Sequence, residues 1–467
     1  MMIESIIRKI APKNLRYLLK QITYPILSHN IIEGKKYTNF VKFLSQSQWW
    51  SDEKIKEWQL NKLKEIINYA YNNVPGYKQL LRESNINPKD IFKLSDIKRL
   101  PFMSKELIRD NLKEFTSKSI PQYQLNYLTT GGSSGIPFGF YNTLDNSKIE
   151  NAFMHSGWLR KGWKPKNKTA ILRGEFIGSK DNLYSYDNAH KTLSLSTYNL
   201  NEKTFEIFLK IIQKSKSKYL HAYPSSAAFL ADLVIEFSEV GKINFEIILL
   251  GSENFYPFQR EKIKKAFPHS KIFSWYGHSE KAVLAQECEK NNEYHFNPFY
   301  GYTEILDKEN NEVSFGKTGE IIGTSFWNYA TPFIRYKTLD YAEKGYSACS
   351  KCKRNFRLAN KFIGREQEMF VLKNNQKISI AAINMHTDIF DKIKHFQFFQ
   401  KIPGKIELKI IPKSKIKNHE INNIQSELLK KLGTETILKI NIVDKISKTK
   451  RGKYKFLDQK IDISKLK

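Results

Sequence analysis

The chain has 467 residues, of which 40% are hydrophobic, and its formal net charge is +30. This length exceeds what one hydrophobic core usually serves, so we expect two domains, one large and one small. No run of eighteen uncharged apolar residues occurs, which argues against a membrane-spanning helix. The cysteines number only three, which argues against a disulfide framework.

The first residues, MMIESIIRKIAPKNLRYLLKQITYPIL, mix basic and apolar side chains without a small-residue cleavage site. This pattern is not that of a secretory signal, and we expect a cytoplasmic protein. The net charge suits nucleic acid, an anionic membrane or an anionic substrate, but a biased genomic composition also produces it, and we expect no nucleic-acid partner. Peripheral binding of the basic N-terminus to anionic lipid is a hypothesis, which full solubility with anionic vesicles at low salt would contradict.

The first clear helical pattern begins after Ser51, in SDEKIKEWQLNKLKEIINYAYNNVPGY. Ser51 is a suitable N-cap, and we expect Pro75 and Gly76 to end the helix. Apolar residues recur at helical spacing along one face of this segment. They are Ile55, Trp58, Leu63, Ile66, Ile67 and Ala70.

The middle of the chain repeats a short apolar run followed by a helical pattern, which is typical of parallel strands joined by crossover helices. Ligands bind at the carboxyl ends of such strands, where the segments YPSS and YGHSE follow. The expected strands are Thr169–Leu172, Tyr219–Ala222, Glu246–Leu250 and Lys271–Trp275, and the expected helices are Ser225–Phe237 and Tyr256–Phe267.

The character of the sequence changes after Gly364. The segments KIELKII, INNIQSELLKKL and TILKINIV predict a strand, a helix and a strand in a separate, very basic module. We therefore predict an α/β protein. Its large N-terminal domain, with mixed and parallel sheets and crossover helices, covers residues 1–364, and a small α+β domain covers residues 365–467.

A run of glycines and hydroxyl side chains lies in LTTGGSSGIPFGF, before Pro137. Glycines let the backbone approach an anion closely, while hydroxyls and main-chain N–H groups wrap phosphate oxygens. A polar surface turn is the alternative, and the Gly-Lys-[Ser/Thr] ending of the Walker A motif is absent. The candidate phosphate-binding residues are Thr129, Thr130, Gly131, Gly132, Ser133, Ser134 and Gly135.

A second candidate, SWYGHSEK, follows an expected strand. Its aromatic residue, Tyr276, can stack on a purine, the Ser279 hydroxyl can bond a phosphate, and the Glu280 carboxylate can help hold Mg²⁺. Gly277 completes the turn between them. A strand-end turn that carries a glutamate by chance is the alternative.

Three further segments carry candidate residues. In TPFIRYKTLDYA, Asp340 can accept both hydroxyls of a ribose, and a salt-bridged edge strand with Arg335 and Lys337 is the alternative. FIGREQE places Arg365 at the expected domain boundary. ISKTKRGKYKF places Lys453 in a basic turn near the C-terminus, where a solvated charge is the alternative.

The order of these five segments is that of the core motifs of adenylate-forming enzymes. The upstream segments WWSDEKIKEWQLNKLKEIINYAYNNVPGYK and LSDIKRLPFMSKELIRDN resemble the start of phenylacetate-CoA ligase relatives, especially the CapK-type proteins associated with capsular polysaccharide loci. The segments YPSS and LLGSEN fit the same branch. From about Trp49 to Lys455, the sequence resembles the phenylacetate-CoA ligase branch of the acyl-CoA synthetase superfamily.

The resemblance implies that Thr130 to Gly135 embrace the phosphates of ATP. It implies that Tyr276 lies against adenine, that Ser279 touches phosphate and that Glu280 binds Mg²⁺. Asp340 then holds the ribose hydroxyls, with Arg365 nearby at the hinge. Lys453 reaches the carboxylate and the α-phosphate, where a positioned ammonium stabilises the charge that builds up during attack.

The mechanism that the resemblance implies has two steps. A small carboxylic acid attacks the α-phosphorus of ATP and releases pyrophosphate, and the small domain then rotates so that an acceptor takes the acyl group. Coenzyme A is the usual acceptor, and an amine or hydroxyl of a sugar is conceivable in a surface-polysaccharide pathway. Three departures from the pattern are Ile136 for Lys, Leu339 for Gly, and NNQKISIAAIN after the Gly-Arg pair. The last puts coenzyme A in doubt more than adenylation.

The cysteines fall in a metal-binding pattern, EC-x₆-H at Cys288 and His295 followed by ACSKCKR at Cys349 and Cys352. Two thiolates separated by two residues can share one ion, and a second pair completes a tetrahedral site. A redox C-x-x-C or unliganded buried thiols are the alternatives, and relatives of phenylacetate-CoA ligase show similar placement. Since four protein ligands leave no open position, we predict a structural Zn²⁺ in an insertion of the large domain over about residues 285–355.

The rival hypothesis of another class is a basic binding protein, for nucleic acid or membrane, that has kept the fold and lost the chemistry. Such a loss would show as missing Glu280, Asp340 or Lys453. All three are present.

Overall fold

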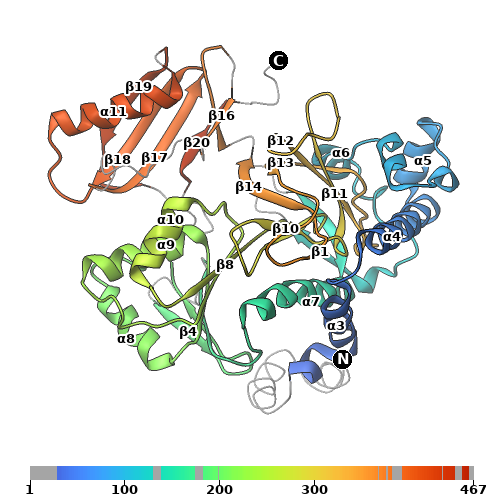
Figure 1. The fold of residues 1–467 in the computed structure, drawn as a ribbon, viewed down its shortest axis with the longest axis horizontal. Coiled ribbons are helices and arrows are strands. Elements are labelled where there is room, and N and C mark those ends of the chain that lie inside the picture. Colours follow the sequence, from blue (N-terminus) through green and yellow to red (C-terminus); the bar gives the residue numbers. More distant parts are fainter. Residues whose placement is uncertain are drawn as a thin grey trace.

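The structure is a computed structural model that describes residues 29–129, 138–173, 182–197, 199–365, 368–374, 377–380, 392–433, 435–446 and 455–461. A twelve-stranded sheet dominates it, in the order β11-β12-β13-β14-β10-β9-β8-β7-β6-β3-β5-β4. A four-stranded sheet, β19-β18-β17-β20, lies apart from it (Figure 1). These two bodies and their helices give the α/β fold, with mixed sheets and a smaller sheet domain, that the sequence predicts.

Four helices form the N-terminal part of the described chain: α3 (His29–Ser47), α4 (Asp52–Asn73), α5 (Pro75–Glu83) and α6 (Lys105–Asp110). The Ser51 hydroxyl caps α4 by accepting the Lys54 N–H at 3.3 Å, as predicted. Of the predicted apolar face of α4, all residues are buried except Trp58, which is partly buried. Helix α4 ends at Asn73, but Pro75 also opens α5, because a proline in the first turn loses no helical hydrogen bond.

The parallel half of the large sheet contains the four strands expected from the sequence. These are β3 (Thr169–Leu172), β6 (Tyr219–Ala222), β7 (Ile247–Leu250) and β8 (Lys271–Gly277), each parallel to the next. Strand β5 (Thr192–Leu195) pairs parallel with β3, and β4 (Tyr184–Asp187) closes this edge antiparallel to β5. One face packs against α8 (Phe205–Ser215), α9 (Pro224–Glu236) and α10 (Pro257–Ala266). Helices α9 and α10 confirm the two predicted crossover helices.

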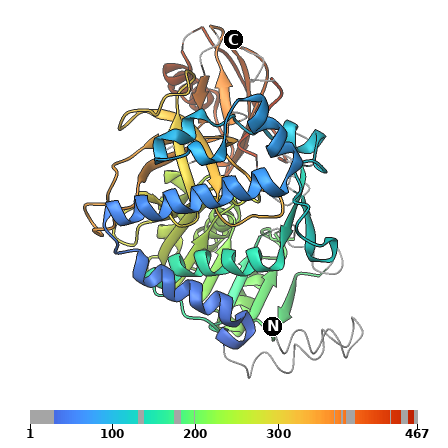
Figure 2. The same ribbon diagram turned by 90° about the vertical axis from the view of Figure 1, so that its right-hand side faces the viewer.

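The other face of these strands meets helix α7 (Leu144–Lys161) and the turn that follows it. Trp158 and Trp163 pack there against Tyr219, Leu249 and Phe273. Helix α7 in turn pairs with α3, and in Figure 2 the blue helices α3 and α4 lie across this side of the molecule.

The antiparallel half of the sheet begins at β9 (Leu284–Glu287), which pairs with the end of β8. It continues through β10 (Tyr294–Phe296), β14 (Leu358–Arg365), β13 (Tyr336–Lys344), β12 (Thr318–Ser325) and β11 (Gly301–Leu306). The strands of segment 285–355 are thus part of the large sheet. A separate hairpin of β1 (Leu125–Thr129) and β2 (Gly139–Thr143) lies beside them, with Thr129 opposite Gly139.

The small domain contains the predicted strand, helix and strand as β18 (Lys405–Pro412), α11 (Asn418–Leu432) and β19 (Ile437–Ile442). Strands β17 (Ile393–Ile402) and β20 (Leu457–Gln459) complete its sheet, and β15 (Met369–Val371) pairs with β16 (Lys377–Ser379). It lies against α9 and α10, where Phe258 meets Phe396 and Phe456 (Figure 1). The chain leaves the large sheet at Arg365; the domain division there remains a prediction.

No helix among the described residues has the length and apolarity needed to cross a membrane. The basic N-terminal segment of the lipid hypothesis, residues 1–28, lies outside the described residues.

Candidate active site and metal centre

The end of strand β8 brings Tyr276 to Asp340 of strand β13. The Tyr276 hydroxyl donates a hydrogen bond of 2.7 Å to Oδ2 of Asp340, a carboxylate that is 7% exposed. The ring of Tyr276 stacks on Phe362 of β14, with centroids 4.2 Å apart and planes 13° apart. Tyr276 and Asp340, which are 64 residues apart in the sequence, therefore meet, and Gly277 is the last residue of the strand that brings them together.

Glu280 lies in the turn after this strand and is buried. One of its carboxylate oxygens lies 3.1 Å from Nδ1 of His278, and the other accepts a hydrogen bond of 3.0 Å from the Tyr336 hydroxyl. Ser279 is exposed between them. A buried carboxylate held by a ring nitrogen and a hydroxyl is a suitable anchor for a cation at the carboxyl end of β8.

The β1–β2 hairpin is tied to the same place. Phe138, which follows the glycine-rich segment, packs against Phe333 with ring centroids 6.3 Å apart. Phe333 packs against Tyr336 at 5.0 Å, and Tyr336 donates to Glu280. Residues 130–137, which include the candidates Thr130 to Gly135, lie outside the described residues; Thr129 is the last residue of β1.

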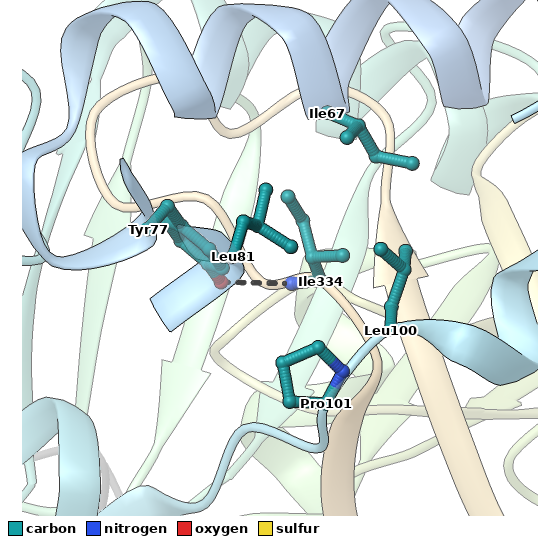
Figure 3. A pocket seen from close by; sticks show the side chains of 6 residues that line it. All are labelled: Ile67, Tyr77, Leu81, Leu100, Pro101 and Ile334. Carbon is teal, nitrogen blue, oxygen red and sulfur yellow. Dashed lines mark hydrogen bonds between the residues drawn. The ribbon is translucent and has the colours of Figure 1, made fainter. Parts of the chain in front are cut away.

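The segment before Tyr336 is fixed by contacts that are structural. The Tyr77 hydroxyl accepts the Ile334 N–H at 3.1 Å and donates to the Pro332 carbonyl at 2.8 Å, in the apolar corner drawn in Figure 3. Arg335 forms a buried ion pair with Glu304, its Nε and Nη2 lying 3.2 and 3.1 Å from the two carboxylate oxygens. Burial raises the pKa of Glu304, and the guanidinium opposes this rise.

The alternative for the RYKTLD segment, a salt-bridged edge strand, is right about the ion pair of Arg335 and wrong about the edge. Strand β13 lies between β12 and β14, so it is not an edge strand. Arg335 is a packing residue, while Asp340 faces the Tyr276 hydroxyl.

The Gly-Arg pair lies next to this cluster, because Arg365 pairs with Asp340 across β13 and β14. Gly364 has a φ of 106°, and a Cβ at this position would collide with the Asn254 amide and the Glu368 carboxylate. The positive φ therefore favours glycine here, and any larger residue would also make these two side chains shift. The side chain of Arg365, and Lys453, lie outside the described residues.

The four predicted metal ligands converge. The ligand atoms of Cys288, His295, Cys349 and Cys352 all lie within 4.8 Å of one another, and all four residues are buried. The sulfurs of Cys288 and Cys349 are 4.0 Å apart, and the Cys352 sulfur lies 3.5 Å from Nε2 of His295. Three sulfurs and one imidazole nitrogen at such spacing suit a tetrahedral Zn²⁺.

The surroundings of the cysteine cluster favour a thiolate at Cys352. Hydrogen bonds from Cys288 and His295 hold the pKa of the Cys352 thiol far below its usual range, while the hydrogen bond to Cys352 and burial raise the pKa of the Cys288 thiol. Arg160 lies close enough to feel the charges of Cys288 and Cys352, and burial together with the charge of Arg354 lowers its pKa to about 10. The Lys290 N–H also points to the Cys288 sulfur at 3.3 Å.

Comparison with known proteins adds to this geometry. Residues 370–460 match the family model described as the CapK C-terminal domain. The protein CapK of Staphylococcus aureus is 24% identical over 92% of this chain and 97% of its own length. The phenylacetate-coenzyme A ligase of Thermus thermophilus is 24% identical over 76% of this chain and 80% of its own length. The chain is a homologue of CapK and of phenylacetate-coenzyme A ligase.

The resemblance predicted from the sequence is thereby confirmed. A solved structure of 2-hydroxyisobutyryl-CoA ligase, in the postadenylation state with an acyl-AMP, matches 88% of the present chain and 91% of its own chain at 16% identity and a TM-score of 0.70. The fold is therefore that of adenylate-forming CoA ligases.

The sequence did not point to three residues that hold Glu280 and Tyr276 in place. Tyr336 and His278 flank Glu280, and Phe362 supports the Tyr276 ring. Tyr336 and His278 stand inside the quoted motifs, so the signal was present in YGHSE and RYKT. Phe362 is a strand residue like many others, and only the pairing of β14 with its neighbours shows its place.

Proposed function

We propose that the chain is an AMP-forming acid ligase that activates a small carboxylic acid with ATP. The observation that carries this proposal is that Tyr276 contacts Asp340 and that Glu280, held by His278 and Tyr336, lies next to them after strand β8, in a chain homologous to phenylacetate-coenzyme A ligase. The acid's carboxylate oxygen attacks the α-phosphorus of ATP. Pyrophosphate leaves and an acyl adenylate remains. In the second step the thiol of coenzyme A attacks the acyl carbon, and AMP leaves.

The described residues have definite tasks in this reaction. Asp340 accepts the ribose hydroxyls, and Tyr276 lies beside the adenine while its hydroxyl holds Asp340. Glu280 holds Mg²⁺, which neutralises phosphate charge when it is bound. His278 and Tyr336 keep the Glu280 carboxylate in place.

The remaining roles are proposed from the resemblance. Thr129, Ser279 and the glycine-rich segment bind the phosphates, and Lys453 of the small domain stabilises charge on the α-phosphate. Arg365 lies at the hinge about which the domain of residues 365–467 turns between the two steps. We also propose a cytoplasmic enzyme that serves surface-polysaccharide synthesis, since a relative of nearly equal length bears the name CapK.

We propose that the cysteine cluster binds one structural Zn²⁺. Three thiolates and a neutral imidazole around a dication leave one net negative charge, which Arg160 and Arg354 are placed to offset. The four ligands fill a tetrahedral shell, so no position is open for substrate.

A second candidate function differs in the acceptor. The small domain matches the CapK C-terminal model, and this domain carries the NNQKISIAAIN segment that departs from the coenzyme A-using pattern. Direct transfer from the adenylate to an amino sugar is therefore the alternative to coenzyme A. Adenylation with consumption of the acid but no acyl-CoA formed would favour this alternative.

The experiment that tests the function is pyrophosphate release from ATP across a panel of aromatic, hydroxy and amino acids. Lys453→Ala is expected to lose this activity, while Lys455→Ala, a basic neighbour near Asp458, keeps it. Equal rates for Lys453→Ala and the parent would remove the role of Lys453. No pyrophosphate with any acid would favour the rival hypothesis of a non-catalytic basic binding protein.

A further inference from the structure

A cavity of about 210 Å³ lies between helix α7 and one face of strands β5, β3 and β6. Thr169 and Ile171 of β3 and His221 of β6 form part of its floor, while His155 and Trp158 line it from α7. A cavity of about 150 Å³ is large enough for benzene, so this one has room for a ring with a substituent.

The walls of this cavity are flat and aromatic. The His155 ring lies 4.6 Å from Trp163 and 5.1 Å from Trp158, and Trp158 lies 5.3 Å from His221, measured between ring centroids. Aromatic walls favour ligands with a planar ring over flexible chains, because rings stack with little loss of conformational freedom.

The inner end of the cavity lies toward the carboxyl ends of β3 and β6, where His221 lines it. Trp275 packs against His221 and Trp158, with centroids 5.4 and 5.7 Å apart. Arg173, which follows β3, contacts Nε2 of His221 at 2.9 Å from outside the lining. A guanidinium at the carboxyl ends of the strands suits the carboxylate that is to be activated.

The outer end is basic. Lys166 and Lys191 line it, both with left-handed backbones of φ 68° and 54°, and the Thr169 N–H holds the Lys191 carbonyl at 3.1 Å. Burial, and then the charge of Lys191, lowers the pKa of Lys166, so the two ammonium groups are close. Within the part of the chain that the structure describes, Lys191 makes no ion pair. Glu33, the acidic residue of the lining, accepts a hydrogen bond from Asn151.

We propose that this cavity holds the side chain of the acid and that the acid carries a second anionic group, which Lys166 and Lys191 bind. This inference rests on the proposed function, because it gives the acid its activated carboxylate at the Arg173 end. Thr169 and Ile171 of the lining lie two residues apart on the strand, or about 7 Å, and Arg173 lies two residues beyond Ile171. The expected ligand is therefore a ring with two carboxylates on opposite sides.

The test compares acids in pairs that differ by one carboxylate: phenylacetate with 4-carboxyphenylacetate, and 3-phenylpropanoate with 3-(4-carboxyphenyl)propanoate. For each, ATP–pyrophosphate exchange is measured, and binding without ATP is measured by quenching of tryptophan fluorescence, since Trp158 and Trp163 line the cavity. The variant is Lys191→Met. Its matched control is Lys216→Met, at another left-handed lysine (φ 51°) that ends helix α8 outside the cavity.

We expect the diacid to exceed its monoacid at least tenfold in kcat/KM and in affinity, and Lys191→Met to abolish this preference while Lys216→Met retains it. Exchange without any preference for the diacid overturns this inference and leaves the proposed function standing. Diacid binding that depends on Lys191, without exchange for any acid, supports the cavity and overturns the proposed function. If neither diacid gives exchange or quenches the fluorescence, the inference is overturned.

Discussion

The cysteine cluster and the carboxylate pair are both assembled from distant segments, but their groups are satisfied in different ways. In the cluster, the sulfurs of Cys288 and Cys349 face one another and Cys352 faces His295, so potential ligands are each other's neighbours. Glu280 and Asp340 instead each accept a tyrosine hydroxyl, from Tyr336 and Tyr276.

This difference fits the two proposed roles, a structural metal site and a site that exchanges its ligands. Close thiolates repel one another in a buried site, and a cation that joins them stabilises the fold. A carboxylate that is held by a neutral hydroxyl can pass to a ribose hydroxyl or to Mg²⁺ at little cost, because one hydrogen bond replaces another. Variants of the two sites should therefore fail in different measurements.

The largest effect is expected for Cys349→Ser. The loss of one thiolate leaves three ligands and opens the tetrahedral shell, so zinc should fall well below one ion per chain and the melting temperature should fall by on the order of 10 °C or more. Metal analysis of chelator-free protein and thermal melting measure both changes. Ser350→Ala, in the same turn but exposed, is the matched control. A parent protein without zinc contradicts the site.

Arg335→Met should come next, with a loss of about 3–5 kcal/mol of stability, because it leaves Glu304 buried without its partner. Without the guanidinium, the pKa of Glu304 rises further above 4.5, so the folded state binds the proton more tightly than the unfolded state. The free energy of unfolding therefore falls as the pH rises from the unfolded pKa toward the raised pKa of the folded state. The deficit should thus be larger at pH 8 than at pH 5.

Denaturant melts of Arg335→Met at several pH values measure this deficit. Lys337→Met, next to it in sequence and half-exposed, should have little effect, and the double variant Arg335→Met/Glu304→Leu should recover part of the loss. A deficit that does not change with pH contradicts the account of Glu304.

These two sites also show what a sequence can propose. C-x-x-C with a second Cys and His, and YGHSE after an apolar strand, carry their chemistry in a few adjacent residues, so candidate residues could be named for both, and the four Cys and His candidates lie together in the fold. Helix α4 and strands β3, β6, β7 and β8 were equally readable, because burial on one or both faces leaves a periodic pattern.

Other features depend on pairing between distant strands, which has no local signal. The sequence suggested an ion pair for Arg335 without naming its partner, since Glu304 lies on β11 and the intervening strand is revealed only by the sheet order. Pro75 was correctly predicted to end α4, but the start of α5 at the same residue, with proline in the first turn, was not predicted.

Glu280→Gln tests the exchanging site. The amide keeps the acceptor for Tyr336 but loses the charge that a cation needs, so pyrophosphate release should fall about 100-fold, or about 2.7 kcal/mol, with the fold unchanged. Raising Mg²⁺ should restore part of the rate. Tyr336→Phe, which keeps the carboxylate, should lose less. Identical Mg²⁺ dependence in the parent and Glu280→Gln would remove the metal role of Glu280.

Tyr276→Phe should give the smallest effect and the most specific one. It keeps the ring stacked on Phe362 and removes only the 2.7 Å hydrogen bond to Asp340, so the carboxylate that accepts the ribose loses its orientation. One hydrogen bond is worth about 1 kcal/mol, and KM for ATP should rise about fivefold with kcat and KM for the acid nearly unchanged.

Deoxy analogues of ATP decide whether that loss passes through the ribose. The parent should discriminate against an analogue that lacks a ribose hydroxyl, and Tyr276→Phe should discriminate less, because its Asp340 is already misplaced. Equal discrimination in both proteins would mean that the Tyr276 hydroxyl does not orient the carboxylate that binds the ribose.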